Sequence, residues 1–113
     1  MFVTISLLLA AACLLPAAGK LAGQPRMRKS AAHFGIPWPR YRLIGVTELT
    51  AAGGILTGLW WHPLGVAAAA GIALLLVGAI IAHRKAADSA KEMAPALLAL
   101  LLTLAYLTIA LMG

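Results

Sequence analysis

The stretch IGVTELTAAGGILTGLWW, residues 44–61, carries one charged side chain, Glu48, in an otherwise uncharged and mostly apolar run. No other charged residue stands between Arg42 and His62. A run of this length predicts a helix in lipid, where a carboxylate costs about 2.5 to 3.5 kcal/mol on insertion scales. Glu48 therefore needs either a partner that offsets this cost or a function that requires the acid.

The composition of the whole chain indicates a membrane protein. Apolar residues make up 63% of the 113 positions and charged residues only 11%, against about 25% charged residues in ordinary soluble domains. A short chain leaves much of its surface exposed, so this apolar content could not be hidden from water. We expect a single membrane-embedded domain over residues 1–113. The formal net charge of +6 is then loop charge and does not indicate nucleic-acid binding.

Four apolar segments each approach the roughly 20 residues that a helix needs to cross the hydrocarbon core. Backbone groups in lipid must be bonded within their own segment, which predicts helices rather than the strands of a barrel. The expected fold is all-α, a bundle of four transmembrane helices. The expected helices cover residues 2–19, 43–61, 64–82 and 93–112.

The basic residues predict the orientation of this bundle. All 9 Lys and Arg residues fall in or beside the first and third loops, and the turn WWHPLG, residues 60–65, has none. The positive-inside rule therefore places the first and third loops in the cytoplasm and both termini outside it. The first apolar run lacks the preceding basic residues of a signal peptide, so we expect it to remain as a helix. The expected location is the cell (inner) membrane, crossed several times.

The first loop contains a further helical pattern that begins at Pro25, a residue suited to the first turn of a helix. Met27, Ala31 and Phe34 share one face of this helix, and its basic residues lie off that face. The pattern predicts a short interfacial helix on the inner leaflet, with a flexible basic linker as the alternative. The side chains expected to contact anionic lipid headgroups are Arg26, Arg28 and Lys29.

Small residues recur in the second and third expected helices, where they permit close approach of two backbones. We expect them to pack against each other within one chain, and an interface between two chains is the alternative. The residues concerned are Gly54 and Gly58 in one helix and Gly65, Ala69, Gly71, Gly78 and Ala82 in the other.

Other polar residues give little indication of redox or metal chemistry. Cys13 is the only cysteine, which excludes a self-contained thiol-disulfide centre because such exchange needs two sulfurs. No paired set of His, Asp or Cys along the sequence predicts a metal site, and we expect none. Ser89 and Glu92 have the spacing of a capping box, which assigns Glu92 and the neighbouring Asp88 a structural role.

Glu48 has candidate partners at its own depth in the membrane. It stands six residues beyond Arg42, which is about 9 Å along a helix. Lys20 at the end of the first helix and His83 at the end of the third are expected at the same level. We therefore predict a polar cluster of Glu48, Lys20 and His83. It either fixes the register of the helices or forms a proton-titrating or ligand-binding site, and the sequence leaves both open.

Several motifs together resemble the DoxX-like family of small four-helix membrane proteins. They are Lys-Leu-x-Gly at 20–23, Ile-Gly-x-x-Glu-Leu at 44–49, Pro-Leu-Gly at 63–65 and the histidine at position 83. The Lys, Glu and His of these motifs recur in the family, so the resemblance supports the predicted cluster. The wider DoxX group is associated with quinone-linked sulfur oxidation and with membrane complexes that handle oxidative or thiol stress. A quinone is thus implied by the resemblance only, and the residues themselves indicate no cofactor.

Three classes of function remain open. The first, which we favour, is a non-catalytic membrane subunit or assembly partner whose basic face binds lipid and which joins a second copy, a membrane protein or a soluble protein. The second is a small proton-coupled transporter, since small multidrug-resistance transporters also have four helices and one membrane Glu. Their acid lies in the first helix, however, whereas Glu48 lies in the second. The third is a membrane subunit of a quinone-linked oxidoreductase, for which the sequence shows no cofactor ligand.

Overall fold

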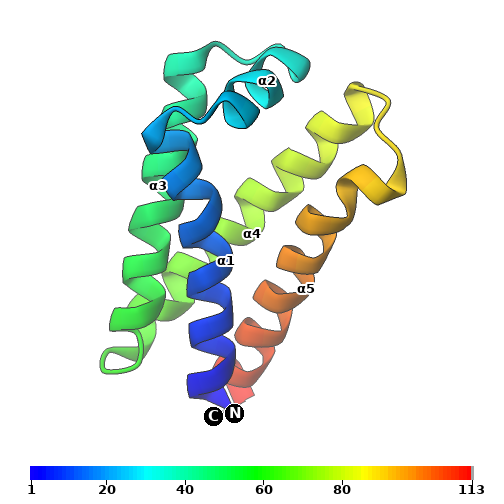
Figure 1. The fold of residues 1–113 in the computed structure, drawn as a ribbon. Coiled ribbons are helices and arrows are strands. Elements are labelled where there is room, and N and C mark those ends of the chain that lie inside the picture. The colour runs from blue at the N-terminus through cyan, green and yellow to red at the C-terminus, as the bar shows by residue number, and fades with distance from the viewer. Residues whose placement is uncertain (113) are drawn as a thin grey trace.

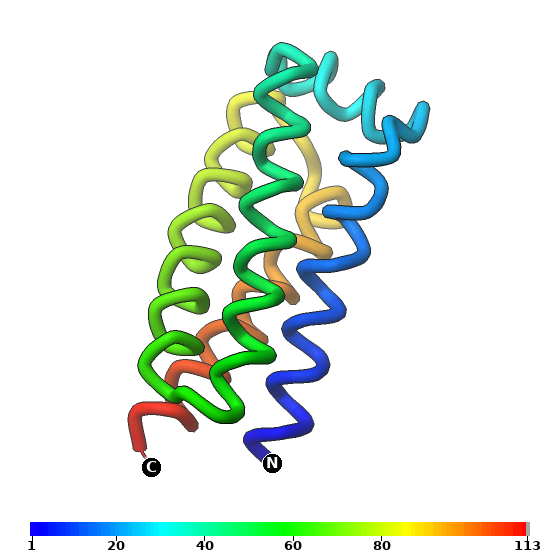
Figure 2. The backbone as a smooth tube through the Cα atoms, turned by 90° about the vertical axis from the view of Figure 1, so that its left-hand side faces the viewer, coloured from blue at the N-terminus to red at the C-terminus, as the bar shows by residue number. Residues whose placement is uncertain are grey.

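The computed structural model describes residues 1–112, which form five helices and no strand. The all-helical prediction is confirmed. Four long helices run along the long axis of the molecule, and a short one crosses one end (Figures 1 and 2). The helices are α1 (Phe2–Ala22), α2 (Pro25–His33), α3 (Trp38–Thr57), α4 (His62–Lys85) and α5 (Ala90–Met112).

Three of these helices, α1, α4 and α5, are long and apolar enough to cross a membrane by length and composition. Their outward side chains include many exposed large apolar residues, such as Leu15 on α1, Val77 on α4 and Leu101 on α5. Side chains of this kind suit contact with lipid tails. The 20-residue helix α3 is not among the three, and it carries Arg40, Arg42 and Glu48.

The ends of α1 and α3 differ from the predicted boundaries. α1 continues past residue 19 to Ala22 and closes in a Schellman motif, in which Gly23 adopts φ 70° and Gln24 N–H donates to Gly19 O at 3.1 Å. Lys20 is therefore part of the last helical turn. α3 starts at Trp38 rather than at residue 43, because prolines are tolerated in the first turn of a helix. It ends at Thr57, so the Trp60–Trp61 pair lies in the turn before α4.

The two remaining long helices also begin earlier than predicted. α4 starts at His62 and runs to Lys85, and α5 starts at Ala90. The capping box before α5 is present: Ser89 N–H donates to Glu92 Oε1 at 3.2 Å, and Glu92 N–H donates to Ser89 Oγ at 3.4 Å. These bonds satisfy free amides at the helix start.

α3 and α4 pack through glycines next to the turn that joins them. A Cβ on Gly58 would lie 2.6 Å from Gly65 Cα, and one on Gly54 would lie 2.8 Å from Ala68 Cβ. The prediction of packing within the chain holds for these residues. It is wrong for Gly71 and Gly78, where an added Cβ would meet nothing within 4 Å. α4 crosses α3 at an angle and leads away from it beyond the turn that joins them (Figure 1).

Candidate functional site

The acid of α3 has a partner inside the bundle. Lys20 Nζ on α1 lies 2.5 Å from Glu48 Oε1, and the two side chains are 10% and 12% exposed. Because α3 begins at Trp38, Glu48 lies about 15 Å along the helix from its first residue, near the middle. The lysine thus reaches a buried position in which neither charge could be left alone without a large cost.

Helix α3 is shaped to receive the lysine. Tyr41, Gly45 and Glu48 stand at spacings of four and three residues and therefore share one face. A Cβ on Gly45 would lie 2.8 Å from Lys20 Cβ, so the glycine makes room for the stem of the lysine. The Tyr41 ring centroid lies 5.0 Å from Lys20 Nζ. This arrangement explains the spacing Gly-x-x-Glu in physical terms: the glycine admits the stem and the acid receives the ammonium.

A small cavity borders Glu48 on the side of the bundle core. Glu48, Cys13 on α1, Ile72 on α4 and Ala99 on α5 are among its lining residues, and its volume is about 20 Å³. That volume accommodates about one water molecule. The Cys13 thiol is buried, as expected for a small apolar filler.

The third residue of the predicted cluster, His83, lies in a different set of contacts. Its Nδ1 is 2.7 Å from Asp88 Oδ2, in the connection between α4 and α5. The physical reason is local, because Asp88 follows His83 by five residues in the turn that ends α4, where Asp88 N–H donates to His83 O at 2.9 Å. The structure brings Lys20 and Glu48 together and pairs His83 with a loop acid instead.

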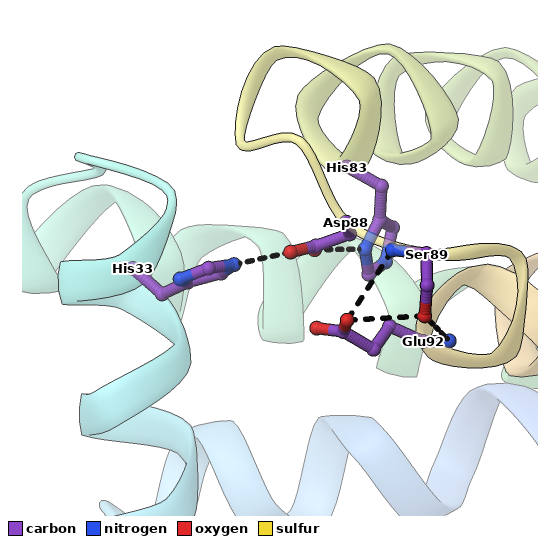
Figure 3. A network of polar contacts seen from close by, with 5 residues as sticks. All are labelled: His33, His83, Asp88, Ser89 and Glu92. Carbon is purple, nitrogen blue, oxygen red and sulfur yellow. Dashed lines mark hydrogen bonds and ion pairs between the residues drawn. The ribbon is translucent and has the colours of Figure 1, made fainter.

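Asp88 is the centre of a second polar network, formed by His33, His83, Asp88, Ser89 and Glu92 (Figure 3). We call it the interfacial network, since it joins α2 to the α4–α5 connection. His33 Nε2 lies 2.7 Å from Asp88 Oδ1, so one carboxylate accepts a hydrogen bond from each of two imidazoles. The Asp88 side chain is 4% exposed. The His83 ring packs edge-on against Phe34 at 4.9 Å between centroids.

The hydrogen bonds to Asp88 determine its charge. Desolvation raises the pKa of this carboxyl, but the hydrogen bonds and positive charge of His33 and His83 outweigh it, so the pKa is lowered from its usual value. Asp88 is therefore ionised at neutral pH and acts only as an acceptor.

The sequence alone indicates no such network, because His33 and Asp88 are 55 residues apart. In the structure, one ligand atom each from His33, Asp88 and Glu92 lie within 4.8 Å of one another, a set able to hold a metal ion. The expectation of no metal site considered only ligands close together along the sequence, and it stays a prediction. The one signal in the sequence was that the first and third loops lie on the same side of the bundle.

The predicted lipid contacts lie at the same end of the molecule. Arg26 and Lys29 are exposed on α2. Arg28 is also used within the chain, because its guanidinium lies 4.6 Å from the Trp38 ring centroid and its Nε donates to Gly23 O at 3.4 Å. Arg26 and Lys29 therefore have more freedom to meet a headgroup than Arg28 has.

A model of the DoxX-like family matches residues 4–106 of the chain. The matched range contains both members of the Lys20–Glu48 pair and all five residues of the interfacial network. No curated protein and no solved structure matches the chain.

Proposed function

The chain belongs to the DoxX-like family, and from this premise we propose that it is a non-catalytic membrane subunit with four spans that assembles with another transmembrane helix. The surface that supports this proposal is the α4 outer face, which we define as Ala67, Gly71, Leu74, Gly78 and Ile81. These five residues are exposed. In this function the Lys20–Glu48 pair fixes the register of α1 and α3 and performs no chemistry.

The fourth span in this proposal is α3. Its 20 residues reach about 30 Å, the thickness of the hydrocarbon core. Arg40 and Arg42 lie in its first turns, where long side chains extend to the interface. The remaining charge, Glu48, is paired with Lys20. α3 also lies alongside α1, which has the length and composition of a span (Figure 2).

The charge distribution supports an orientation in the inner membrane. The basic residues of α2, of the start of α3 and of the α4–α5 connection lie at one end of the molecule, and both chain ends lie at the other (Figure 1). By the positive-inside rule the basic end faces the cytoplasm. In this orientation α2 lies at the inner leaflet, with Arg26 and Lys29 at anionic headgroups.

The observation that carries the assembly proposal is the difference between the α4 outer face and the exposed face of α5. Gly71 and Gly78 are open and seven residues apart, and Leu74 between them is 75% exposed. Spacings of four and three residues along this face match the seam of a helix pair. In lipid, small residues let a second helix approach closely, whereas lipid-facing surfaces need no such residues. The exposed face of α5 carries leucines at 97, 98, 101 and 104 instead.

We expect a cysteine placed at Leu74 to form an intermolecular cross-link in native membranes. The test uses Cys13→Ala protein, so that Leu74→Cys carries the only thiol, and measures adduct formation with an oxidant or a short bismaleimide. The matched control is Leu101→Cys on α5, a leucine that is 62% exposed. Adduct mass distinguishes a second copy from another membrane protein. Equal cross-linking at both positions, or survival of the Leu74→Cys adduct after adding Gly78→Leu, contradicts the proposal.

A second candidate function, proton-coupled transport, is favoured by one observation: Glu48 borders a cavity of a size that holds a water molecule. A carboxylate in contact with water inside a bundle can exchange protons. For this function we expect proton-driven uptake or efflux in liposomes that Glu48→Gln abolishes, in protein that still elutes as a folded species. The non-catalytic proposal predicts no such flux in either the original or the Glu48→Gln protein.

A further inference from the structure

The interfacial network has the composition of a metal site rather than of a simple salt bridge. It combines imidazole nitrogen from His33 with carboxylate oxygen from Asp88 and Glu92, and the candidate ligand atoms lie within 4.8 Å of one another. Nitrogen and oxygen donors of this kind bind Zn²⁺ and related divalent first-row metals. Ca²⁺ and Mg²⁺ prefer oxygen ligands alone, so the imidazole favours a transition metal.

The spacing of these atoms suits a single ion after small side-chain movements. Ligands about 2.1 Å from a tetrahedral metal are about 3.4 Å apart. His33 Nε2 and Asp88 Oδ1 are now 2.7 Å apart and would separate slightly, while Glu92 would approach. His33 and Glu92 can make these movements, since the His33 side chain is 48% exposed and Glu92 lies at the surface.

Asp88 is the fixed member of the set. Its side chain is nearly buried, and His83 holds the Oδ2 atom at 2.7 Å. An imidazole N–H that holds the free oxygen of a ligand carboxylate is a common outer partner in metal sites, because it orients the ligand. His83 is in turn packed against Phe34.

The capping box does not prevent Glu92 from acting as a ligand. Ser89 N–H and Ser89 Oγ both contact the same carboxylate atom, Oε1, of Glu92. The other oxygen, Oε2, is therefore available for a metal while the cap remains. Two carboxylates also supply two negative charges, which offset the repulsion of a divalent cation by basic residues at this end of the molecule, including Arg84 and Lys91.

We propose that His33, Asp88 and Glu92 form a binding site for a divalent transition metal such as Zn²⁺, with His83 as the outer residue that positions Asp88. The site joins α2 to the start of α5 at the basic end of the bundle (Figure 3). Bound metal thereby cross-links two segments that are 55 residues apart in the chain. This proposal is independent of the assembly proposed for α4.

The test uses the detergent-solubilised protein without a histidine tag. Zn²⁺ is titrated into it, and the heat of binding is measured by calorimetry. We expect one Zn²⁺ per chain and a rise in Tm with Zn²⁺ but not with Mg²⁺. His33→Ala, Asp88→Asn and Glu92→Gln each weaken binding by more than about a hundredfold, and His83→Ala by about ten- to a hundredfold. The absorption of bound Co²⁺ measures metal binding to the same variants directly, whereas a change in Tm also depends on the stability of each variant.

The matched control is His62→Ala, which removes the third histidine of the chain at the opposite end of the bundle, where its Nε2 contacts Ala110 O at 2.8 Å. Its Zn²⁺ affinity should equal that of the original protein. Glu92→Gln keeps the capping box, because glutamine also serves in that position, so its loss of binding does not come from misfolding. The proposal is overturned if the original protein shows no saturable Zn²⁺ binding, or if His62→Ala loses binding that His33→Ala retains.

Discussion

Glu48→Gln and Lys20→Met should each lower the free energy of unfolding by about 3 to 5 kcal/mol, because each leaves one buried charge without its partner. The double variant should recover a large part of the loss, since no unpaired charge remains. The pair is 2.5 Å apart and nearly buried, so the coupling energy between the two positions should exceed about 1 kcal/mol. This is the largest stability effect that we expect from a polar substitution in the chain.

The measurement is reversible unfolding in mixed detergent micelles, with helix content followed as denaturing detergent is added. Lys91→Met serves as the control for the lysine, because Lys91 is exposed at the start of α5. Its effect should stay within about 0.5 kcal/mol. Losses in the two single variants that simply add in the double variant would show that Lys20 and Glu48 do not act as a pair.

Gly58→Leu and Gly65→Leu should each destabilise the bundle by about 3 kcal/mol or more, and in cells the variant proteins should be degraded or aggregate. At Gly58 the added Cβ meets the backbone of Gly65, 2.6 Å from Cα and 2.9 Å from N, and backbone cannot rotate away. At Gly65 the new side chain meets the hydroxyl of the fully buried Tyr106 and Gly58 Cα. The helices must separate to admit it, which exposes the core around Ile55 and Tyr106.

Gly71→Leu is the matched control, because the same substitution on the same helix meets open space. Leucine also has a higher helix propensity than glycine, so the stability of the monomer should be unchanged or slightly higher. Gly71→Leu should nevertheless weaken assembly through the α4 outer face, which separates folding from association. Similar melting temperatures for Gly65→Leu and Gly71→Leu would contradict the packing seen between α3 and α4.

Local properties of the sequence determined the helices and their grouping. Apolar runs near 20 residues predicted the four long helices, and the pattern after Pro25 predicted α2, because helix formation depends on spacing and composition within one segment. The basic loops predicted that α2 and the α4–α5 connection lie at the same end. Lys20 could be proposed for Glu48 because both were expected at one depth. Helix ends were less certain, since the Schellman motif and the prolines of α3 extend the helices beyond the apolar runs.

Only the tertiary structure decided which residues meet across helices. Gly54 and Gly58 predicted that α3 and α4 pack together, but the direction in which α4 crosses α3 has no local sequence signal. The same crossing leaves Gly71 and Gly78 exposed. The interfacial network depends on it as well, because side chains 55 residues apart become neighbours only when helix angles bring their segments together. The position of a residue along one helix can be read from the sequence, whereas rotation and crossing are properties of the packed bundle.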